Sequence, residues 1–508
     1  MRPARFRKRP FVTIVRKIGR NMFWLTVGKV ATVILALGTV ALMTRHLGPQ
    51  GYGIFRSAQA YMAFAQLLAN LGLAVIVARE IARPGADQVR ILGNAIGLRL
   101  VTAAVILGTA VLLSWLIPYE AEVRLGILLA FVGFLALSCF QTLIAVFQQR
   151  LEQAGQVWAE VAGATGLFLA AAVLSGLDLG PLPFVAAMSL AFLLQAAIAW
   201  LAAGRFLAIR PRFEWRQWKA ILIPALPLAL ANILTLVYYR ADTVLLSVFH
   251  PPEAVGQYGV ATKVLDTVVG FTIMFTSLML PLLSRLAQDG PRFRQYLQAS
   301  FDALAIAVPG MAMLFFLFAE EVATLIAGPA FAASAVPLRI LSVTMALMSF
   351  SLLLRHTATA LDQQRHILPG FVVAAGLALG IYFLAIPTWA EVGAAFGTVV
   401  GEAVVVTWIL GVLHRRSGLR MRTGALWRAF CAAGSAALAA WLTKGSGLPW
   451  PLAFAITGCV YLAGLLALRA IPLDTLFMVL GIERPRFASF AGRSRPPVPG
   501  SGSDGIGS

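Results

Sequence analysis

Charged residues are scarce in this chain of 508 residues. Only 12% of the residues are Asp, Glu, Lys or Arg, against about 25% in a typical soluble protein, and 59% are hydrophobic. The mean hydropathy is +0.83. This composition excludes a soluble enzyme, a disordered chain and a fibrous protein. The hydrophobic residues suffice for about fourteen membrane helices of about 20 residues each, so the sequence predicts an all-α polytopic membrane protein.

Cysteine and acidic residues are also few. Cys139, Cys431 and Cys459 all lie inside apolar stretches, which indicates neither a disulfide framework nor a metal site, and no cofactor is expected. The chain has 21 acidic residues against 41 Lys and Arg, for a net charge of +20. In a soluble protein this excess would suggest a nucleic acid partner. In a membrane protein the usual explanation of such an excess is that Lys and Arg are concentrated in the cytoplasmic connections, where they set the topology.

Fourteen apolar runs alternate with charged or Gly/Pro-containing turns, and most are long enough to cross about 30 Å of hydrocarbon. The runs fall at 21–43, 54–77, 91–117, 125–147, 156–176, 182–203, 218–239, 257–284, 297–318, 334–354, 367–388, 391–413, 427–443 and 449–471.

The cations are distributed very unequally between the two sides of these runs. Alternate connections on the N-terminal side hold 32 of the 41. The other side holds Arg45, Arg56, Arg124, Arg240 and Lys444, and four cations lie within helices: Lys29, Arg99, Lys263 and Arg339. This asymmetry predicts that both termini are cytoplasmic. It also removes the nucleic acid reading, because no extended basic domain exists.

The runs divide the chain into segments. We expect a basic cytoplasmic arm at 1–20, an N-lobe of six helices at 21–203, a linker at 204–217, a C-lobe of six helices at 218–413, two further helices at 427–471 and a disordered tail at 485–508. The tail is rich in Gly, Ser and Pro. The connections are too short for a folded catalytic domain, so the function is expected within the helical bundle.

A short motif recurs in the two halves. Gly51-Tyr52-Gly53 is matched by Gln257-Tyr258-Gly259, at an offset of 206 residues. Arg79 and Arg285 share this offset, and Gln195 matches Glu402 at 207. Chance similarity between apolar helices is the competing explanation. If the repeat is real, the two six-helix lobes run in the same direction around an axis along the membrane normal and enclose a cavity that opens to either side.

Polar residues inside the runs are candidate site residues, because a charge near the bilayer centre costs about 2.5–3.5 kcal/mol on insertion scales. The substrate-binding candidates are Lys29, Arg56, Gln66, Asn70, Arg240 and Lys263. The candidates for coupling or gating are Asp242, Asp266 and Glu402, together with Pro224 and Pro227, which remove two backbone donors and should kink the seventh helix.

Each candidate also has a structural reading. Gln and Asn in membrane helices are more often interhelical contacts than ligands. Lys263 and Asp266 are three residues apart and could neutralise each other. Arg240 and Asp242, at the expected outer end of the seventh helix, could lie in the membrane interface, where charge is inexpensive. Lys29 has no acidic partner within a turn of its own helix, which makes it the sharpest candidate.

The sign of these charges predicts the cargo. Lys29, Arg56, Arg240 and Lys263 come from the first, second, seventh and eighth runs, whose symmetry-related positions would face each other. They are opposed mainly by Asp242 and Asp266. A net positive cavity would attract an anionic head group such as a phosphate or diphosphate.

Two segments carry a resemblance to a known family. The first is Arg45-His46-Leu47-Gly48-Pro49-Gln50-Gly51-Tyr52-Gly53-Ile54-Phe55, preceded by Arg20-Asn21 and Trp24-Leu25. The second is Tyr239-Arg240-Ala241-Asp242-Thr243-Val244-Leu245-Leu246, and Gly393-Ala394-Ala395 with Thr398 and Glu402 adds to it. With these residues the chain resembles the polysaccharide transporter, or oligosaccharide flippase (Wzx-like), family of the multidrug/oligosaccharidyl-lipid/polysaccharide exporter superfamily over about residues 15–470.

The resemblance implies a two-lobed fold of fourteen helices in the bacterial inner membrane. It implies transport of an undecaprenyl-diphosphate-linked oligosaccharide to the outer leaflet by alternating access, alongside other membrane proteins of polysaccharide assembly. Cationic residues at the positions of Lys29, Arg56, Arg240 and Lys263 would hold the diphosphate or an acidic sugar.

Other functions remain open. A lipid II flippase or a multidrug exporter would have the same fold. A membrane polysaccharide polymerase or ligase would usually have a large external loop with catalytic Arg or His, which this chain lacks. An ATP-driven pump would need a phosphate-binding loop, and Gly28-Lys29-Val30 lacks the required flanking residues.

Overall fold

The computed structural model describes residues 9–70, 87–150, 152–207 and 209–470, together with residues 77, 80, 81 and 85. The side chains of residues 9–23 and 224–239 lie outside this description, as do the segment 1–8 and the predicted tail at 485–508. The basic arm predicted at 1–20 therefore lies largely outside the described residues.

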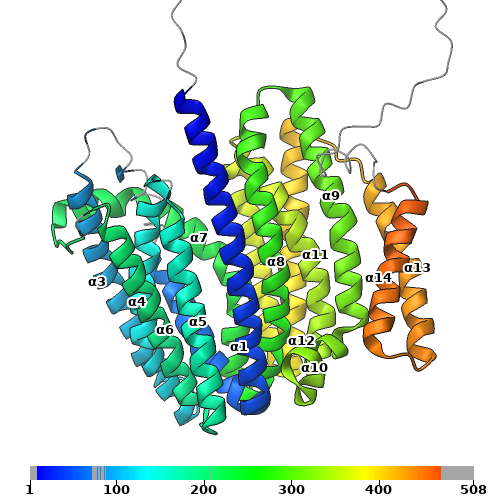
Figure 1. Ribbon diagram of the computed structural model, residues 1–508, viewed down its shortest axis with the longest axis horizontal. Coiled ribbons are helices and arrows are strands. Elements are labelled where there is room, and N and C mark those ends of the chain that lie inside the picture. Colours follow the sequence, from blue (N-terminus) through cyan, green and yellow to red (C-terminus); the bar gives the residue numbers. More distant parts are fainter. Residues whose placement is uncertain are drawn as a thin grey trace, which may run out of the picture.

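All secondary structure in the described residues is helical (Figure 1). The helices are α1 (Arg9–Ala69), α3 (Gln88–Ser114), α4 (Ala121–Arg150), α5 (Ala154–Gly176), α6 (Pro181–Gly204), α7 (Trp215–Phe249), α8 (Pro252–Leu286), α9 (Gly290–Leu317), α10 (Ala319–Ala327), the 3-10 helix η1 (Pro329–Ser334), α11 (Ala335–Ala360), α12 (Gln364–Ser417), α13 (Gly424–Gly445) and α14 (Trp450–Ala467). Helices α1 and α3–α6 form the N-lobe and α7–α12 the C-lobe, while α13 and α14 pack against α9 at one edge.

Two of these elements, α1 and α12, each consist of two helical segments separated by a break in the backbone. Each element contains two of the predicted runs. In α1 the break is at Gly48, whose φ of 63° suits glycine, and Pro49 then begins the second half with its fixed φ. In α12 the break is at Ala390, with a φ of 43°. Eleven helices in the described part are long and apolar enough to cross a membrane. With two runs each in α1 and α12, and one more in α7, they accommodate the fourteen predicted runs.

The two lobes pack together at the end of the bundle where α1 turns, which we call the Gly48 end. A hydrophobic cluster there includes Tyr52 and Ile54 of the N-lobe with Val260 and Phe331 of the C-lobe. The rings of Tyr52 and Phe331 meet edge to face at 6.0 Å. The hydroxyls of Tyr119 and Ser247 add a buried hydrogen bond of 2.9 Å between the lobes.

Glycine permits the closest part of this contact. A Cβ on Gly53 would overlap the carbonyl oxygen of Pro252, and a Cβ on Gly256 would overlap the carbonyl oxygen of Pro49. Each glycine lies four residues after a proline that starts its helix segment, so the second half of α1 and the start of α8 contact each other reciprocally. The lobes are thus in backbone contact at the Gly48 end.

Helix α7 connects the lobes at the opposite end. Near its start, Ile221 lies in a hydrophobic cluster with residues of α3, α4, α5 and α6. Near its end, Ala241 and Leu246 lie in the main cluster of the C-lobe. The linker before α7 lies along α3, where the amide of Arg212 donates to the carbonyl of Gly93 at 2.9 Å.

Glu214 fastens this linker and yields a prediction. Its backbone amide donates to Asn94 Oδ1 at 2.8 Å, and its carboxylate accepts from Arg90 Nε at 2.8 Å. The hydrogen bond from Arg90 is the main reason why the pKa of Glu214 lies below its ordinary value. A group whose pKa is lowered by folding stabilises the fold above its unfolded pKa and loses this contribution as the pH falls.

We therefore expect Glu214→Gln to lower the thermal unfolding temperature slightly at pH 7, because the pair is exposed. The difference from the wild type should shrink as the pH falls through about 4, where the unfolded carboxylate is protonated. Thermal unfolding of both proteins in detergent between pH 3.5 and 7 measures this. A difference that is constant across this range would show that the charge of Glu214 is not involved.

Candidate cation site between the lobes

Arg56 lies where the two lobes meet. It is about two turns after Pro49 in the second half of α1. Its guanidinium donates from Nη1 to Gln59 Oε1 at 2.6 Å and from Nη2 across the interface to Thr262 Oγ1 at 3.3 Å. A Cβ on Gly259 would lie 2.9 Å from Arg56 Nε, so this glycine leaves room for the guanidinium against α8. Arg56 is therefore shared by both lobes.

Arg240 and Asp266 form an ion pair within the C-lobe. Arg240 on α7 donates from Nη1 and Nη2 to the two carboxylate oxygens of Asp266 on α8, at 3.2 Å each. The side chains remain 37% and 30% exposed, so the pair is accessible. The sequence allowed a pair between Lys263 and Asp266. The two-pronged contact of Asp266 is with Arg240 of the neighbouring helix, while its charge also acts on Lys263.

Lys263 and Lys29 complete the group of cations. Lys263 is half-buried, and the charges that act on it are those of Arg56, Asp266, Lys29 and Arg240. Lys29 is exposed, and its Cε lies 3.8 Å from where a Cβ on Gly270 of α8 would be. We call Lys29, Arg56, Arg240 and Lys263 the cation cluster. Among the described residues Asp266 is the one carboxylate that acts on Lys263, so the cluster carries an excess of positive charge.

A small cavity of about 110 Å³ adjoins the cluster. Its apolar lining comes from both halves of α1 and from α5, and its polar lining comes from Thr39, Tyr52, Arg56, Gln59 and Lys263. The cavity is too small for an oligosaccharide in this conformation. The lobes therefore have to move apart beside this cavity before it can hold a large ligand, although Lys29 and the Arg240–Asp266 pair are already accessible.

Two of the sequence predictions about helix ends are wrong. The apolar sequence after residue 239 continues the helix, so α7 ends at Phe249, and Arg240 and Asp242 lie about two turns inside it. Arg56 was also assigned to an outer end and lies inside a helix. The charges of these residues are consequently deeper in the bundle than the sequence predicted.

Gln66 lies away from the cation cluster, in a buried network of the N-lobe. Its Oε1 accepts from Ser138 Oγ at 2.9 Å, and its Nε2 donates to Gln141 Oε1 at 3.3 Å. Gln141 Oε1 also accepts from Arg99 Nη2 at 2.9 Å, and Arg99 is only 1% exposed. Gln66 thus has structural partners, whereas Asn70 is half-buried just after the end of α1. A contact of either with substrate stays a prediction.

Asp242 is the centre of a buried polar network in the C-lobe. It is 4% exposed. Its Oδ2 accepts from the hydroxyl of Tyr258 at 2.6 Å and from Thr398 Oγ1 at 3.4 Å, and its Oδ1 accepts from the amide of Thr243 at 2.6 Å. The hydroxyl of Tyr382 lies 3.0 Å from Thr398 Oγ1. This network joins α7, α8 and both halves of α12.

The remaining candidates differ in their surroundings. Glu402 is buried, and its Oε1 lies 3.6 Å from Arg355 Nη2, whose guanidinium also covers the ring of Phe371. Pro224 and Pro227 belong to a helical part of α7 whose side chains lie outside the described residues. Their role in gating stays a prediction.

Several residues of these networks were not identified as site candidates from the sequence. Arg355 lies one residue beyond the predicted run 334–354 and was therefore placed in a connection. Tyr258 was noted only as part of a repeated motif, and Thr398 only for its family resemblance. Tyr382 and Gln141 were not identified. A polar residue in the middle of an apolar run was the available signal for the last two.

The comparisons with known proteins agree with this architecture. Residues 18–287 match the family described as polysaccharide biosynthesis protein. No curated protein matches the chain. Among solved structures, the lipid II flippase MurJ in an inward closed conformation is similar with a TM-score of 0.73 and 9% identity, over 90% of this chain and 99% of that one.

Two other transporters are similar at lower TM-scores. A multidrug resistance MATE family transporter of the MOP superfamily, in an inward-facing conformation, has a TM-score of 0.57 and 16% identity over 76% of this chain and 95% of its own. A MOP superfamily transporter from Pyrococcus furiosus has a TM-score of 0.53 and 14% identity over 79% and 96%. At these identities the similarities show the fold.

Proposed function

Because this chain belongs to the polysaccharide biosynthesis protein family, we propose that it is a flippase for an undecaprenyl-diphosphate-linked oligosaccharide. The transport would take place across the bacterial inner membrane, with both termini in the cytoplasm, for the assembly of a surface polysaccharide. The observation that supports this cargo is the cation cluster between the lobes. Three cations and one carboxylate act on Lys263, and an excess of fixed positive charge in a membrane protein favours an anionic ligand.

The arrangement of the cluster suits a diphosphate. Lys29, Arg56 and Lys263 offer ammonium and guanidinium donors from both lobes, and such donors form strong charge-assisted bonds to phosphate oxygens. Asp266 holds Arg240 in place without cancelling the whole charge. A cationic drug would be repelled by the same cluster, which favours a lipid-phosphate cargo over multidrug export.

Alternating access follows from the two contact regions. The lobes touch through Gly53 and Gly256 at the Gly48 end, and α7 joins them at the other end. We propose that the Gly48 contact opens when the cargo is released to the outer leaflet. Asp242 is the proposed coupling group, because a buried carboxylate can take up a proton or a cation and so change how α7, α8 and α12 pack.

The test is complementation of a strain that lacks its own oligosaccharide flippase. We expect Lys29→Ala and Arg56→Ala to lower surface polysaccharide about tenfold or more at equal protein level, because each removes a charge-assisted contact. Lys29→Arg and Arg56→Lys should retain part of the activity. Arg124→Ala is the matched control, since it removes a cation that lies against Trp115 outside the cluster.

Normal polysaccharide from both alanine variants would contradict the role of the cluster. The same wild-type gene should be introduced into cells depleted of their lipid II flippase. We expect no rescue of these cells. If they grow, and if the gene does not restore surface polysaccharide in the first strain, the cargo would be assigned to peptidoglycan synthesis.

A further inference from the structure

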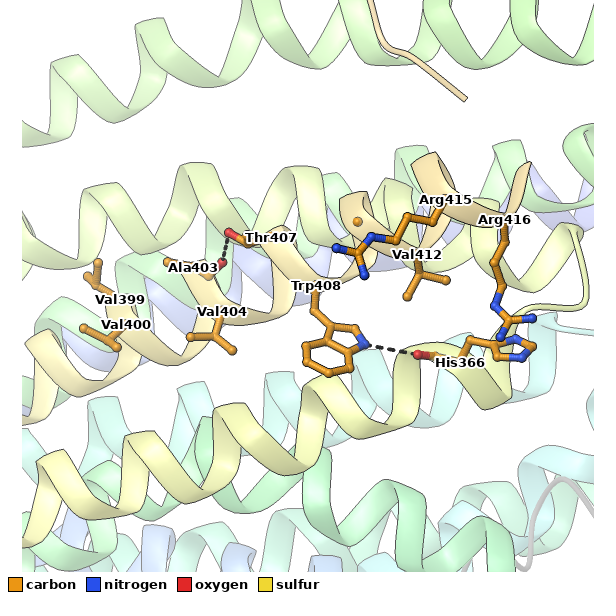
Figure 2. Close-up of a pocket in the computed structure, with 11 residues that line it drawn as sticks. His366, Val399, Val400, Ala403, Val404, Thr407, Trp408, Val412, Arg415 and Arg416 are labelled. Carbon is orange, nitrogen blue, oxygen red and sulfur yellow. Dashed lines mark hydrogen bonds between the residues drawn. The ribbon is translucent and has the colours of Figure 1, made fainter. Parts of the chain in front are cut away.

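A long groove lies on α12, away from the cation cluster. It has a volume of about 1030 Å³ and follows the second half of α12 from Val399 to Arg416, facing the start of the first half at His366 (Figure 2). At 1.5 Å per residue this path is about 25 Å long, close to the thickness of a hydrocarbon core. It ends at the opposite end of the bundle from Gly48, because α12 turns back at Ala390.

The lining of the groove is apolar along its length and cationic at one end. Val399, Val400, Val404 and Val412 supply apolar side chains, and Thr407 donates to the carbonyl of Ala403 at 2.7 Å, so its hydroxyl is satisfied. An aqueous pathway would expose polar groups along this path. The lining instead suits a hydrocarbon chain.

Trp408 sets the boundary between the two parts. Its indole lies over Gly370, where a Cβ would overlap the ring, and its Nε1 donates to the carbonyl of His366 at 3.1 Å. Trp408 is 38% exposed. A half-exposed tryptophan with an anchored N–H is typical of the level of lipid head groups.

Beyond Trp408 the polar groups converge. Figure 2 shows the side chains of Arg415 and Arg416 at the same end of the groove as His366, and all three residues line it. Both arginines are exposed, and neither forms an ion pair with another described residue. His366 Nδ1 is buried and has no hydrogen-bond partner among the described residues. This end therefore presents two exposed cations without an ion-pair partner among the described residues.

A second groove of about 490 Å³ lies in the N-lobe, between α5 and α6. Its lining contains Trp158 and Arg205, but it also contains Glu152. The N-lobe groove thus lacks the excess of positive charge. Of these two grooves, the α12 groove is thus the one whose lining carries an excess of positive charge.

We propose that the α12 groove binds an anionic phospholipid of the membrane leaflet on that side. One acyl chain lies along the valines, and the phosphate accepts hydrogen bonds from Arg415 and Arg416. Basic pockets between membrane helices at this level are suited to phospholipid head groups. The site is separate from the cation cluster and does not depend on the identity of the cargo.

The test uses the purified full chain in neutral detergent and phosphatidylglycerol with brominated acyl chains, which quench nearby tryptophan. The difference in quenching between wild type and Trp408→Phe isolates the groove from the other tryptophans. We expect saturable quenching of this component. The Arg415→Gln/Arg416→Gln variant should need about 10–30-fold more lipid, since each cation near the surface is worth roughly 1 kcal/mol.

Two variants and two lipids make the result decisive. Arg420→Gln/Arg422→Gln removes the same charge from the next connection and should bind like the wild type. Arg415→Lys/Arg416→Lys should retain most of the affinity, which separates loss of charge from loss of folding. Equal quenching by brominated phosphatidylcholine would overturn the proposal, and so would displacement of phosphatidylglycerol by much lower concentrations of undecaprenyl phosphate, which would assign the groove to the cargo.

Discussion

A Gly256→Val variant is expected to insert into the membrane and to lose transport almost completely. A valine Cβ at this position would overlap the carbonyl oxygen of Pro49 and would lie only 3.2 Å from the amide nitrogen of Gly53. Both are backbone atoms of a helix start and cannot move aside as a side chain can. The lobes therefore cannot close at the Gly48 end, and the proposed alternating access, which requires this closure, would be lost.

The size of this effect follows from overpacking. Extra methyl groups in a tight contact cost about 1–3 kcal/mol. Because this cost falls only on the conformation in which the lobes touch, it lowers the population of that conformation about 5–150-fold. Surface polysaccharide in the complementation strain, normalised to protein level, measures the loss. Accessibility of a cysteine placed at Ser57, a buried residue beside the contact, should rise in parallel.

Gly380→Val is the matched control, because this glycine also lies in a helix and a Cβ added to it would have no neighbouring atom within 4 Å. We expect it to transport normally. If Gly256→Val transports as well as Gly380→Val, the glycine contact does not have to close during the cycle. Gly53→Val should reproduce the defect from the other lobe, since its Cβ would meet Pro252.

Asp242→Asn is expected to fold and to lower transport at least tenfold. The asparagine oxygen can still accept from the hydroxyl of Tyr258, so the network of α7 and α8 is retained. The amide cannot take up a proton or balance a cation, however, and the proposed coupling is lost. Transport in vesicles under imposed proton and sodium gradients measures this, and we expect the residual rate to be independent of both gradients.

Two further variants separate the charge of Asp242 from its packing. Asp242→Ala removes the carboxylate that accepts from the buried hydroxyl of Tyr258, at a cost of about 1–3 kcal/mol. It should therefore unfold at a lower temperature than Asp242→Asn. Tyr258→Phe keeps the carboxylate and should retain gradient dependence. Wild-type transport by Asp242→Asn, still dependent on a gradient, would place the coupling elsewhere.

The sequence predicted the helices and an excess of positive charge among the candidate site residues, because both depend on local patterns in the sequence. Apolar runs give the helices, and Gly48 followed by Pro49 gives the turn between the first two. The pairing between helices was not predictable in the same way. Periodicity places Asp266 on one face of its helix, but it does not show that Arg240 rather than Lys263 lies opposite the carboxylate.

Contacts between polar residues that are far apart along the chain could not be predicted from the sequence either. Glu402 was identified as an unusual charge in the middle of a helix, but its partner Arg355 is on another helix and was assigned to a connection. On α1, Gln59 contacts Arg56 near the interface, whereas Gln66, seven residues later on the same helix, contacts Ser138 inside the N-lobe. A small rotation of the helix about its axis decides which of these two environments a side chain faces. The apolar residues around it in the sequence do not reveal this rotation.

The path of α7 has a consequence for biosynthesis. Its beginning fills the core of the N-lobe through Ile221, although its remainder belongs to the C-lobe. During translation the N-terminal half emerges first, and domains generally fold in that order. The first lobe cannot finish packing at six helices; it has to wait until the first turns of the seventh have been made. The start of α7 thereby fixes the position of the second lobe relative to the first before the rest of the second lobe has been synthesised. The two lobes are then assembled as one unit during synthesis.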